Sequence, residues 1–318
     1  MKAVVTKTYG FVGVLEIEET SIPQINEDEI LVEVRAASIN PLDVRIRDGE
    51  FKMMTGKKPP RILGVDYAGV VSAVGENVSI FQVGDEVFGM LDGFKTKEGS
   101  YAQYLKAKAE DMTFKPNNLS FEEAASLPLV ALTAYQALVE LGDIAKGEHI
   151  LINGATGGVG SVAVQIAKAL GCHVTATCSQ QNLSFATALG ADRVIDYAQE
   201  DVYSSPIPYD VIFDTVGNLD FGRCKTILNP EGLYVTTDAP VSLIILTPLA
   251  NLLRRKKMKI VLSKPNGSML SVIRDMIEEG EINAHIFKRF VMEEIHEAHL
   301  LMEKGGFRGK LVLTMGGV

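Results

Sequence analysis

Apolar residues in the first 120 positions come in short runs that glycine and proline separate. Runs of this length and spacing are typical of strands joined by turns. The pattern predicts a small domain that resembles a β-barrel, with strands at residues 3–6, 29–36, 69–74, 85–88 and 101–105.

The pattern changes to helical spacing from residue 121 onward. Residues 121–140 are expected to be helical, with Ser120 as the N-cap and Glu122 and Glu123 in the first turn. Further along, an apolar strand at 150–152 leads into a glycine-rich turn, a helix with an apolar face that ends at Gly171, and a strand at 174–177. These elements together form one βαβ unit.

The second half of the chain alternates short apolar strands with helical stretches. Strands are expected at 193–195, 211–213, 233–236, 260–263 and 310–314, and helices at 268–279 and 293–304. Alternation of this kind favours a doubly wound parallel sheet. The predicted fold class is therefore α/β, with a β-rich domain followed by a parallel-sheet domain.

The glycine-rich turn is the strongest chemical signal in the chain. Its spacing is Gly154-x-x-Gly157-x-x-Gly160, between a strand and a helix. Glycines there allow a tight turn and a close approach of backbone N–H groups to a pyrophosphate, and the helix N-terminus favours negative charge. An ordinary glycine-rich turn is the alternative, but the complete βαβ unit favours a dinucleotide site.

The segment after the second strand of this unit indicates which dinucleotide is bound. An acidic residue there would hold the ribose 2′-OH of NAD, but residues 178–182 contain no carboxylate. Ser179 and Asn182 can donate hydrogen bonds to a 2′-phosphate. Because this segment has no lysine or arginine, Arg193 and Tyr197 are candidates for the remaining contact. The predicted cofactor is NADP (NADPH).

Length and composition agree with a soluble enzyme. The 318 residues exceed one ordinary core and predict about two domains, and 47% of them are hydrophobic and 22% charged. The net charge of −9 argues against a nucleic-acid partner. Three cysteines without framework spacing and no signal-peptide pattern predict a reducing, cytoplasmic setting.

One apolar segment, residues 241–253, is followed by the basic run 254–257. It is too short to span a bilayer and contains Pro248. We favour an apolar flap over the active site or an interface element, since apolar lining is usual for ligand sites. Docking on an anionic membrane surface is the alternative.

Six motifs in order resemble the medium-chain dehydrogenase/reductase superfamily, in its quinone oxidoreductase and alkenal reductase branch. Besides the glycine turn, they are Ser-Ile-Asn-Pro-Leu-Asp (38–43), Gly-Val-Asp-Tyr-Ala-Gly (64–69), Val-Gly-Asp-Glu-Val-Phe-Gly (83–89), Ala-Leu-Thr-Ala-Tyr (131–135) and Gly-Lys-Leu-Val (309–312). The resemblance implies a GroES-like substrate domain at 1–120, completed by 286–318, and a Rossmann NADP-binding domain at 121–285. It also implies a homodimer with strand 260–263 near the two-fold axis.

The resemblance makes zinc a discriminating feature. The alcohol-dehydrogenase branch carries a cysteine in the first motif and Gly-His-Glu in the second, whereas this chain has Asn40, Val65 and Asp66. The four-cysteine structural lobe is also missing. His296 and His299 are the only histidines with paired spacing, and that spacing is more typical of a solvated helix face. We expect no metal site.

Without zinc, the easier acceptors of hydride are already electrophilic, namely quinones and α,β-unsaturated carbonyls (enals and enones). The predicted function is NADPH-dependent reduction of such a small molecule. The alternatives are a zinc-free alcohol dehydrogenase-like oxidoreductase, a membrane-associated reductase of lipophilic quinones, and an NADPH-binding protein with little turnover.

By resemblance, Asn40 and Asp43 are the candidate catalytic residues, beside nicotinamide and substrate. For Asp43 we favour hydrogen bonding to backbone or ribose, and direct proton transfer is the alternative. Candidate cofactor-binding residues come from both ends of the chain and from the βαβ unit: Asn40, Thr133, Gly154, Thr156, Gly157, Gly158, Val159, Ser179, Asn182, Tyr197, Val216, Gly217 and Lys310.

Overall fold

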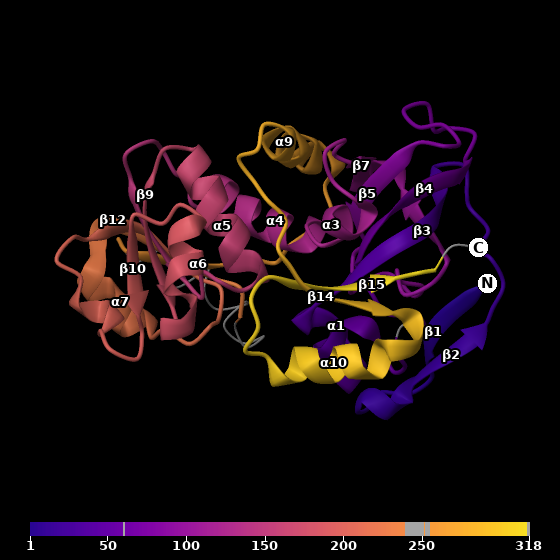
Figure 1. Cartoon of the computed structure of the whole chain (residues 1–318), viewed down its shortest axis with the longest axis horizontal. Coiled ribbons are helices and arrows are strands. Elements are labelled where there is room, and N and C mark those ends of the chain that lie inside the picture. Colours follow the sequence, from indigo (N-terminus) through magenta and orange to yellow (C-terminus); the bar gives the residue numbers. More distant parts are fainter. Residues whose placement is uncertain (60, 239–250, 252–254, 317–318) are drawn as a thin grey trace. The chain divides into compact units, whose positions relative to one another are not determined.

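The computed structural model describes residues 1–59, 61–238, 251 and 255–316. It divides into two compact units, and each is described by itself. The first comprises Met1–Leu129, Lys264–Gly280 and Ala284–Val318, and the second comprises Val130–Ser263 and Glu281–Asn283. The α/β fold class predicted from the sequence is confirmed, with one β-rich unit and one parallel-sheet unit (Figure 1).

The first unit is built on a seven-stranded sheet in the order β14-β15-β3-β4-β5-β7, in which β6 also pairs with β3. A separate hairpin joins β1 to β2. The strands are β1 (Lys2–Thr6), β2 (Leu15–Glu19), β3 (Glu29–Ile39), β4 (Asp66–Val74), β5 (Glu86–Met90), β6 (Tyr104–Lys108), β7 (Met112–Phe114), β14 (Ile286–Val291) and β15 (Lys310–Thr314).

The helices of the first unit are α1 (Pro41–Asp48), α2 (Lys52–Thr55), α3 (Phe121–Ala125), α9 (Gly267–Glu278) and α10 (Ile295–Lys304). Helix α3 packs on β3 and β4, and α9 packs on β7. These contacts group both helices with the seven-stranded sheet of the first unit. The expected domain limits, 1–120 with 286–318 and 121–285, stay a prediction.

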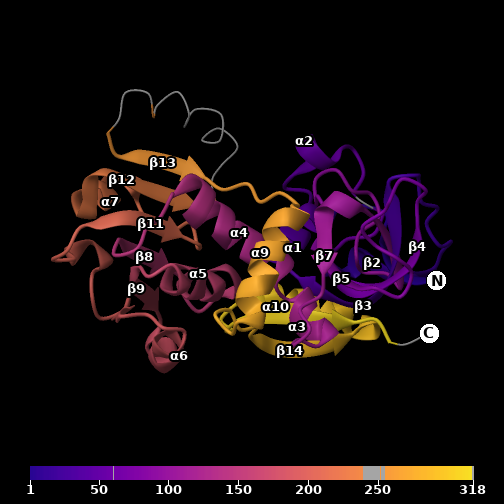
Figure 2. The same ribbon diagram turned by 90° about the horizontal axis from the view of Figure 1, so that it is seen from above.

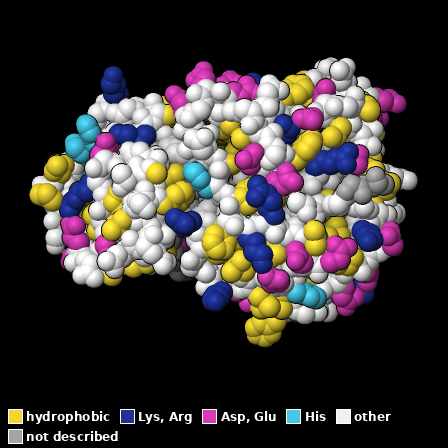
Figure 3. Space-filling model, in the orientation of Figure 1, with side chains coloured by type: hydrophobic (Ala, Val, Ile, Leu, Met, Phe, Trp, Pro, Cys, Tyr) yellow, Lys and Arg dark blue, Asp and Glu magenta, His cyan; other side chains and the backbone are white. Residues whose placement is uncertain are grey.

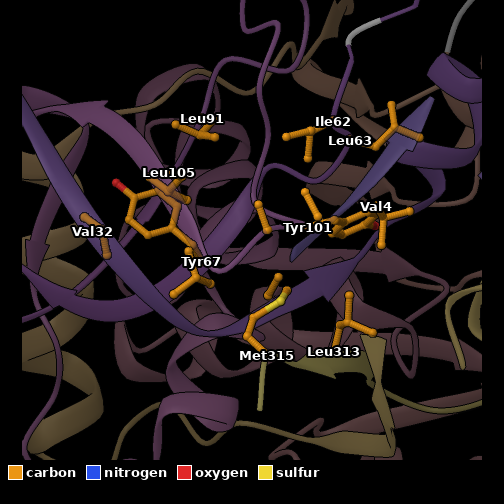
Figure 4. Close-up of a cluster of buried hydrophobic side chains, with 14 of the residues drawn as sticks. Val4, Val32, Ile62, Leu63, Tyr67, Leu91, Tyr101, Leu105, Leu313 and Met315 are labelled. Carbon is orange, nitrogen blue, oxygen red and sulfur yellow. The ribbon is translucent and has the colours of Figure 1, made fainter. Parts of the chain in front are cut away.

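The core of the first unit gathers residues that lie far apart in the sequence. Figure 4 shows Val4 of β1, Val32 of β3, Tyr67 of β4 and Leu313 of β15 among its buried side chains. Because β15 pairs with β3, the C-terminal strand completes the sheet of the N-terminal part. Burial of these side chains is the main favourable contribution to folding of this unit.

The second unit contains a six-stranded parallel sheet in the order β10-β9-β8-β11-β12-β13. Its strands are β8 (His149–Asn153), β9 (His173–Cys178), β10 (Arg193–Asp196), β11 (Tyr209–Asp214), β12 (Leu228–Thr236) and β13 (Lys257–Ile260). The strand order reverses between β8 and β11. In open parallel sheets, ligands bind at the carboxyl ends of strands beside such a switch point.

The helices of the second unit are α5 (Gly158–Ala169), α6 (Leu183–Ala188) and α7 (Phe221–Ile227), and most of α4 (Pro128–Tyr135) belongs to it. Helix α5 packs on β8 and β9, which confirms the predicted βαβ unit. The predicted helix at 121–140 is divided into α3, α4 and a π-helical turn, Gln136–Leu141, because Pro128 interrupts the first helix.

Two predicted strands are shifted along the chain. The strand expected at 101–105 is β6, Tyr104–Lys108, whose position follows from its pairing with Glu29–Glu33 of β3. The strand expected at 260–263 is β13, Lys257–Ile260, which pairs with β12. Three strands were not predicted: β2 and β14 carry several charged residues, and β7 has only three residues.

The apolar run 241–253 lies outside the described residues, apart from Asn251. Its expected roles as a flap, an interface element or a membrane contact therefore stay predictions. No helix in the described part of the chain is long and apolar enough to cross a membrane. On the face shown in Figure 3, basic and acidic side chains are interspersed rather than gathered by sign.

Candidate functional site

The predicted site residues divide between the two units, so each group is described in its own unit. Asn40, Asp43 and Lys310 belong to the first unit. Thr133, on α4, belongs to the second unit, as do the residues of the glycine turn and of the segments after β9, β10 and β11.

The glycine turn follows β8 and leads into α5. Gly154 has φ +78°, and a Cβ there would lie 2.4 Å from Val216 Cγ2. A Cβ on Gly160 would lie 2.2 Å from the Gly154 carbonyl oxygen. Both positions therefore require glycine, because a side chain would displace the turn or the helix. At Gly157 a Cβ would meet only ordinary contact, 3.6 Å from Gly154 O.

Helix α5 begins directly after this turn, so its N-terminus lies at the turn. Gly157 is its N-cap, Thr156 precedes the cap, and Gly158 and Val159 form the start of the first turn. The first N–H groups of a helix have no partner within the helix, and they carry the positive end of its dipole. The backbone donors and the absence of side chains at Gly154 and Gly160 fit a pyrophosphate group.

Two predicted cofactor contacts, Ser179 and Asn182, follow the carboxyl end of β9. The Asn182 Nδ2 atom donates to Ser179 Oγ at 3.1 Å and to Thr156 Oγ1 at 3.3 Å. The segment after β9 is therefore joined to the glycine turn. Tyr197 follows β10, is 60% exposed, and its backbone N–H donates to Cys178 O at 3.3 Å.

Arg193 does not lie in this group. It begins β10, opposite Thr175 of β9, whereas Ser179 follows the carboxyl end of β9. Its guanidinium forms an ion pair with Glu200. The expectation that Arg193 could be the charged partner of a 2′-phosphate is therefore not supported by its position.

The loop after β11 contains the predicted contacts Val216 and Gly217. Their backbone N–H groups donate to Asp214 Oδ1 at 3.1 and 2.9 Å. Asp214 is fully buried and ends β11, next to β8 in the sheet. Asp214 was not predicted as a site residue, although an aspartate that ends an apolar strand is a usable signal.

In the first unit, Asn40 is the N-cap of α1, immediately after β3. Its backbone N–H donates to Asp43 Oδ2 at 2.9 Å, which completes a capping box. Its side-chain Nδ2 donates to Asp66 Oδ2 at 3.0 Å, and its Oδ1 accepts a hydrogen bond from Lys310 Nζ. Both ends of the Asn40 amide are therefore engaged, and its orientation is fixed.

Asp66, at the start of β4, lies at the centre of this cluster and is fully buried. Its Oδ2 accepts from Ser38 Oγ at 2.5 Å and lies 3.7 Å from Lys310 Nζ. Its Oδ1 accepts from the Leu129 backbone N–H at 2.7 Å. These partners stabilise the buried carboxylate.

Asp43 and Lys310 are nearly buried, at 1% and 5% exposure. The pKa of Asp43 is raised to about 7, because burial and nearby Asp66 raise it by more than the Asn40 N–H, Tyr101 and Lys310 lower it. Burial also lowers the pKa of Lys310, which Asp66 and Asp43 oppose. The Asp43 carboxyl can therefore change protonation near neutral pH.

Tyr101 was missed by the sequence analysis. Its hydroxyl donates to Asp43 Oδ2 at 3.0 Å, so the same oxygen caps α1 and accepts from Tyr101. Nothing in the local pattern could have indicated this contact, because the two residues are 58 positions apart. With two hydrogen bonds to one oxygen, the geometry of Asp43 suits the role of holding the start of α1.

The expectation of a solvated helix face at His296 and His299 is wrong for His299. This side chain is fully buried, and its Nδ1 lies 3.1 Å from the Arg47 NH1 donor. Burial, together with the nearby Arg47 and His296, lowers the pKa of His299 to about 3. Among the described residues, no group of three or more His, Cys, Asp or Glu side chains could hold a metal ion. The absence of zinc stays a prediction.

Two family models match the chain. A model described as alcohol dehydrogenase GroES-like domain matches residues 26–117, and one described as zinc-binding dehydrogenase matches residues 189–313. The first agrees with the predicted GroES-like domain. The second overlaps most of the strands of the parallel sheet and the return of the chain to β15.

Relatives match almost the whole chain. The 2-methylene-furan-3-one reductase of Solanum lycopersicum is 36% identical, over 98% of this chain and 79% of the relative. The chloroplastic NADPH-dependent alkenal/one oxidoreductase of Arabidopsis thaliana is 34% identical over the same shares. The solved structure of the quinone oxidoreductase from Coxiella burnetii is 33% identical, with a TM-score of 0.89 and 99% of each chain covered. The chain therefore belongs to the medium-chain dehydrogenase/reductase superfamily of oxidoreductases, in its quinone oxidoreductase and alkenal reductase branch.

Proposed function

We propose that this protein is an NADPH-dependent reductase that transfers hydride to a quinone or to an α,β-unsaturated carbonyl without zinc. The observation that carries the proposal is Asn40. The position where the alcohol-dehydrogenase branch has a cysteine ligand holds a neutral amide, and that amide is fixed by Asp66 and Lys310. An amide in this place can orient a polar acceptor, whereas a zinc site needs a thiolate, imidazole or carboxylate.

The choice of NADPH is supported by the segment after β9. NADPH, when bound, supplies the hydride. The N-terminus of α5 would bind the pyrophosphate, and Ser179 and Asn182 would donate hydrogen bonds to the 2′-phosphate. Thr156 already orients the Asn182 amide at 3.3 Å. No carboxylate in residues 178–182 would repel the phosphate.

The acceptor would be held by Asn40 and adjacent residues of the first unit. Conjugation in quinones, enals and enones spreads the charge that hydride addition creates, so these acceptors need no Lewis acid. We assign the proton that completes the reduction to solvent. Asp43 is the alternative donor, but it is buried and its Oδ2 already accepts two hydrogen bonds.

The setting and the assembly are further parts of this proposal. We place the protein in the cytoplasm, supported by the three cysteines, which are free and buried. We also propose a homodimer that forms through β13, which ends the order of the parallel sheet in the described part of the chain. An edge strand of this kind can pair with a second copy through its other backbone groups, while the Asn251 side chain bonds the N–H and C=O of Met258.

The test is a steady-state screen with the full chain. NADPH oxidation should occur with a panel of quinones, enals and enones, and NADP-dependent oxidation of small primary alcohols should be slow or absent. Rapid alcohol oxidation with no activity on any conjugated acceptor would contradict the proposal. NADPH binding without turnover on any acceptor would favour a binding protein instead.

A substitution connects this function to the site. Asn40→Ala should lower kcat with conjugated acceptors more than it weakens NADPH binding, because the amide orients the acceptor. Asn77→Ala is the matched control, since Asn77 is exposed and its side-chain amide donates to the surface carboxylates of Glu27 and Asp28. Equal loss of kcat in both variants would contradict the role of Asn40.

A further inference from the structure

We propose that Asp214, Asn153 and Thr177 are positioning residues for the cofactor. They hold the glycine turn after β8 and the loop after β11 in one fixed conformation. The inference rests on the proposed function, because it assumes that both segments face NADPH. All of the residues involved belong to the second unit.

These side chains form one polar row across four strands of the parallel sheet, β9, β8, β11 and β12, which are labelled in Figure 2. The strand register places Thr177 of β9 opposite Asn153 of β8, Asn153 opposite Asp214 of β11, and Asp214 opposite Thr236 of β12. All four residues are buried. The row lies at the carboxyl ends of the strands on both sides of the switch point, where ligands bind in such sheets.

Asn153 connects the glycine turn to the rest of the row. Its Oδ1 accepts from Thr177 Oγ1 at 2.6 Å, and the same hydroxyl oxygen accepts from the Gly154 backbone N–H at 3.1 Å. Its Nδ2 donates to Asp214 Oδ1 at 2.7 Å and to Asn218 Oδ1 at 2.8 Å. The amide therefore uses both hydrogens and its oxygen, which permits only one orientation.

Asp214 connects the row to the loop after β11. Its Oδ1 accepts from the backbone N–H groups of Val216 and Gly217, at 3.1 and 2.9 Å. Its Oδ2 accepts from the Leu219 N–H at 2.9 Å and from the Tyr234 hydroxyl at 2.8 Å. Three backbone N–H groups of the loop thus donate to one carboxylate, so the conformation of the loop depends on the position of Asp214.

Burying the Asp214 carboxylate costs hydration free energy, which would be unfavourable if the polar row served only to stabilise the fold. A fully buried carboxylate must recover its lost hydration through hydrogen bonds. Apolar residues in such a row would stabilise a sheet as well or better, whereas a satisfied polar network selects one conformation. The segments that the network connects, Gly154 and the pair Val216–Gly217, are those predicted to contact the cofactor. Positioning of these segments explains why the buried charge is present.

The first test is Asp214→Asn. An amide nitrogen replaces one acceptor oxygen, so at least one loop N–H loses its partner. We expect the NADPH Kd, measured by fluorescence titration, to rise by about tenfold, the usual effect of one lost buried hydrogen bond. Peptides that cover residues 214–219 should exchange amide hydrogens faster in the cofactor-free protein.

The matched control is Asp210→Asn, at the other end of the same strand. Asp210 Oδ2 accepts from the His149 N–H at 2.9 Å, at the amino ends of β8 and β11. Asp210 also connects β11 to β8, but at the amino ends of these strands and far from their carboxyl ends. Neither the NADPH Kd nor the exchange of residues 214–219 should change in this control.

A milder pair of variants keeps the test decisive if Asp214→Asn does not fold. Thr177→Val removes the hydroxyl but keeps the shape, and Thr177→Ser keeps the hydroxyl. We expect Thr177→Val to weaken NADPH binding by about tenfold and Thr177→Ser to remain within about twofold of the wild type. If the Thr177 hydroxyl only stabilised the fold, Thr177→Val and Thr177→Ser would bind NADPH with the same affinity.

Two results would overturn the proposal. One is unchanged exchange of residues 214–219 in Asp214→Asn, since the loop would then not depend on the carboxylate. The other is unchanged NADPH affinity in Thr177→Val, whether or not Asp214→Asn folds. If the wild-type chain itself fails to bind NADPH, the proposed function fails first, and the exchange data still report whether the carboxylate holds the loop.

Discussion

Replacing Asp43 by asparagine should remove the fall in stability that this carboxyl contributes between pH 3.8 and about 7. Asp43 is 1% exposed and accepts hydrogen bonds from the Asn40 N–H at 2.9 Å and the Tyr101 hydroxyl at 3.0 Å. Burial raises its pKa to about 7, with Asp66 adding to the effect. Asparagine can accept the same two bonds through its oxygen and is neutral at every pH.

The sign follows from proton binding in the two states. Below pH 3.8, the ordinary pKa, the carboxyl is protonated in both the folded and the unfolded chain. Between pH 3.8 and about 7 the unfolded chain has released its proton and the folded chain still holds it, so stability falls as pH rises. Above that range both forms are ionised. The interval corresponds to a loss of about 4 kcal/mol that the asparagine variant should not show.

The assay is urea unfolding of both proteins at half-unit steps from pH 4 to 8, with the free energy of unfolding compared at each step. Relative to the wild type, the variant should gain stability steadily up to pH 7 and then stay level. Asp28→Asn, which removes the charge of an exposed side chain, is the control and should follow the wild-type profile. If the difference between Asp43→Asn and wild type changes by less than about 1 kcal/mol over this range, the assigned burial effect is wrong.

Three further predictions concern the cofactor, the metal and the assembly. Ser179→Asp should weaken NADPH binding by about 1–3 kcal/mol, because the new carboxylate repels the 2′-phosphate and a hydrogen bond is lost. Fluorescence titration should show a much smaller effect on NADH binding. Tighter binding of NADH than of NADPH by the wild type would contradict the choice of cofactor. Metal analysis should find no stoichiometric zinc, and activity should persist in chelator, because Asn40 and Val65 are not zinc ligands; about one zinc per chain with activity lost on its removal would refute this. Light scattering at micromolar concentration should show a dimer. Met258→Pro places a proline on the edge strand β13 and should shift the equilibrium toward the monomer. A monomeric wild type would exclude the assembly.

The sequence alone determined the features that depend on neighbouring residues. The βαβ unit from β8 to β9 was predicted because alternating strand, glycine turn and amphipathic helix follow one another along the chain. Ser120 was recognised as an N-cap for the same local reason, and its side chain does accept from the Glu123 N–H at 3.2 Å. Local hydrogen bonding and hydrophobic spacing are readable without knowledge of the fold.

The bounds of the strands β13 and β6 depend on the strands that they pair with, and these partners cannot be identified from the local sequence. The strand β13 is lysine-rich and resembles a loop, but its register against Leu233–Thr236 of β12 makes it a strand. The strand β6 begins at Tyr104 because β3 offers its hydrogen bonds there and not at Tyr101. A strand is completed by its neighbour's hydrogen bonds, so its ends follow from tertiary structure.

The environment of the candidate site was decided by tertiary structure as well. Asn40 could be selected from its motif, but its partner Lys310 is 270 positions away and reaches it only because β15 pairs with β3. Asp66 became the centre of the cluster because β4 begins beside β3. Burial in that cluster, which no local pattern encodes, gives Asp43 its raised pKa. The chain thus specifies its chemical groups locally, and the pairing of distant strands specifies what those groups can do.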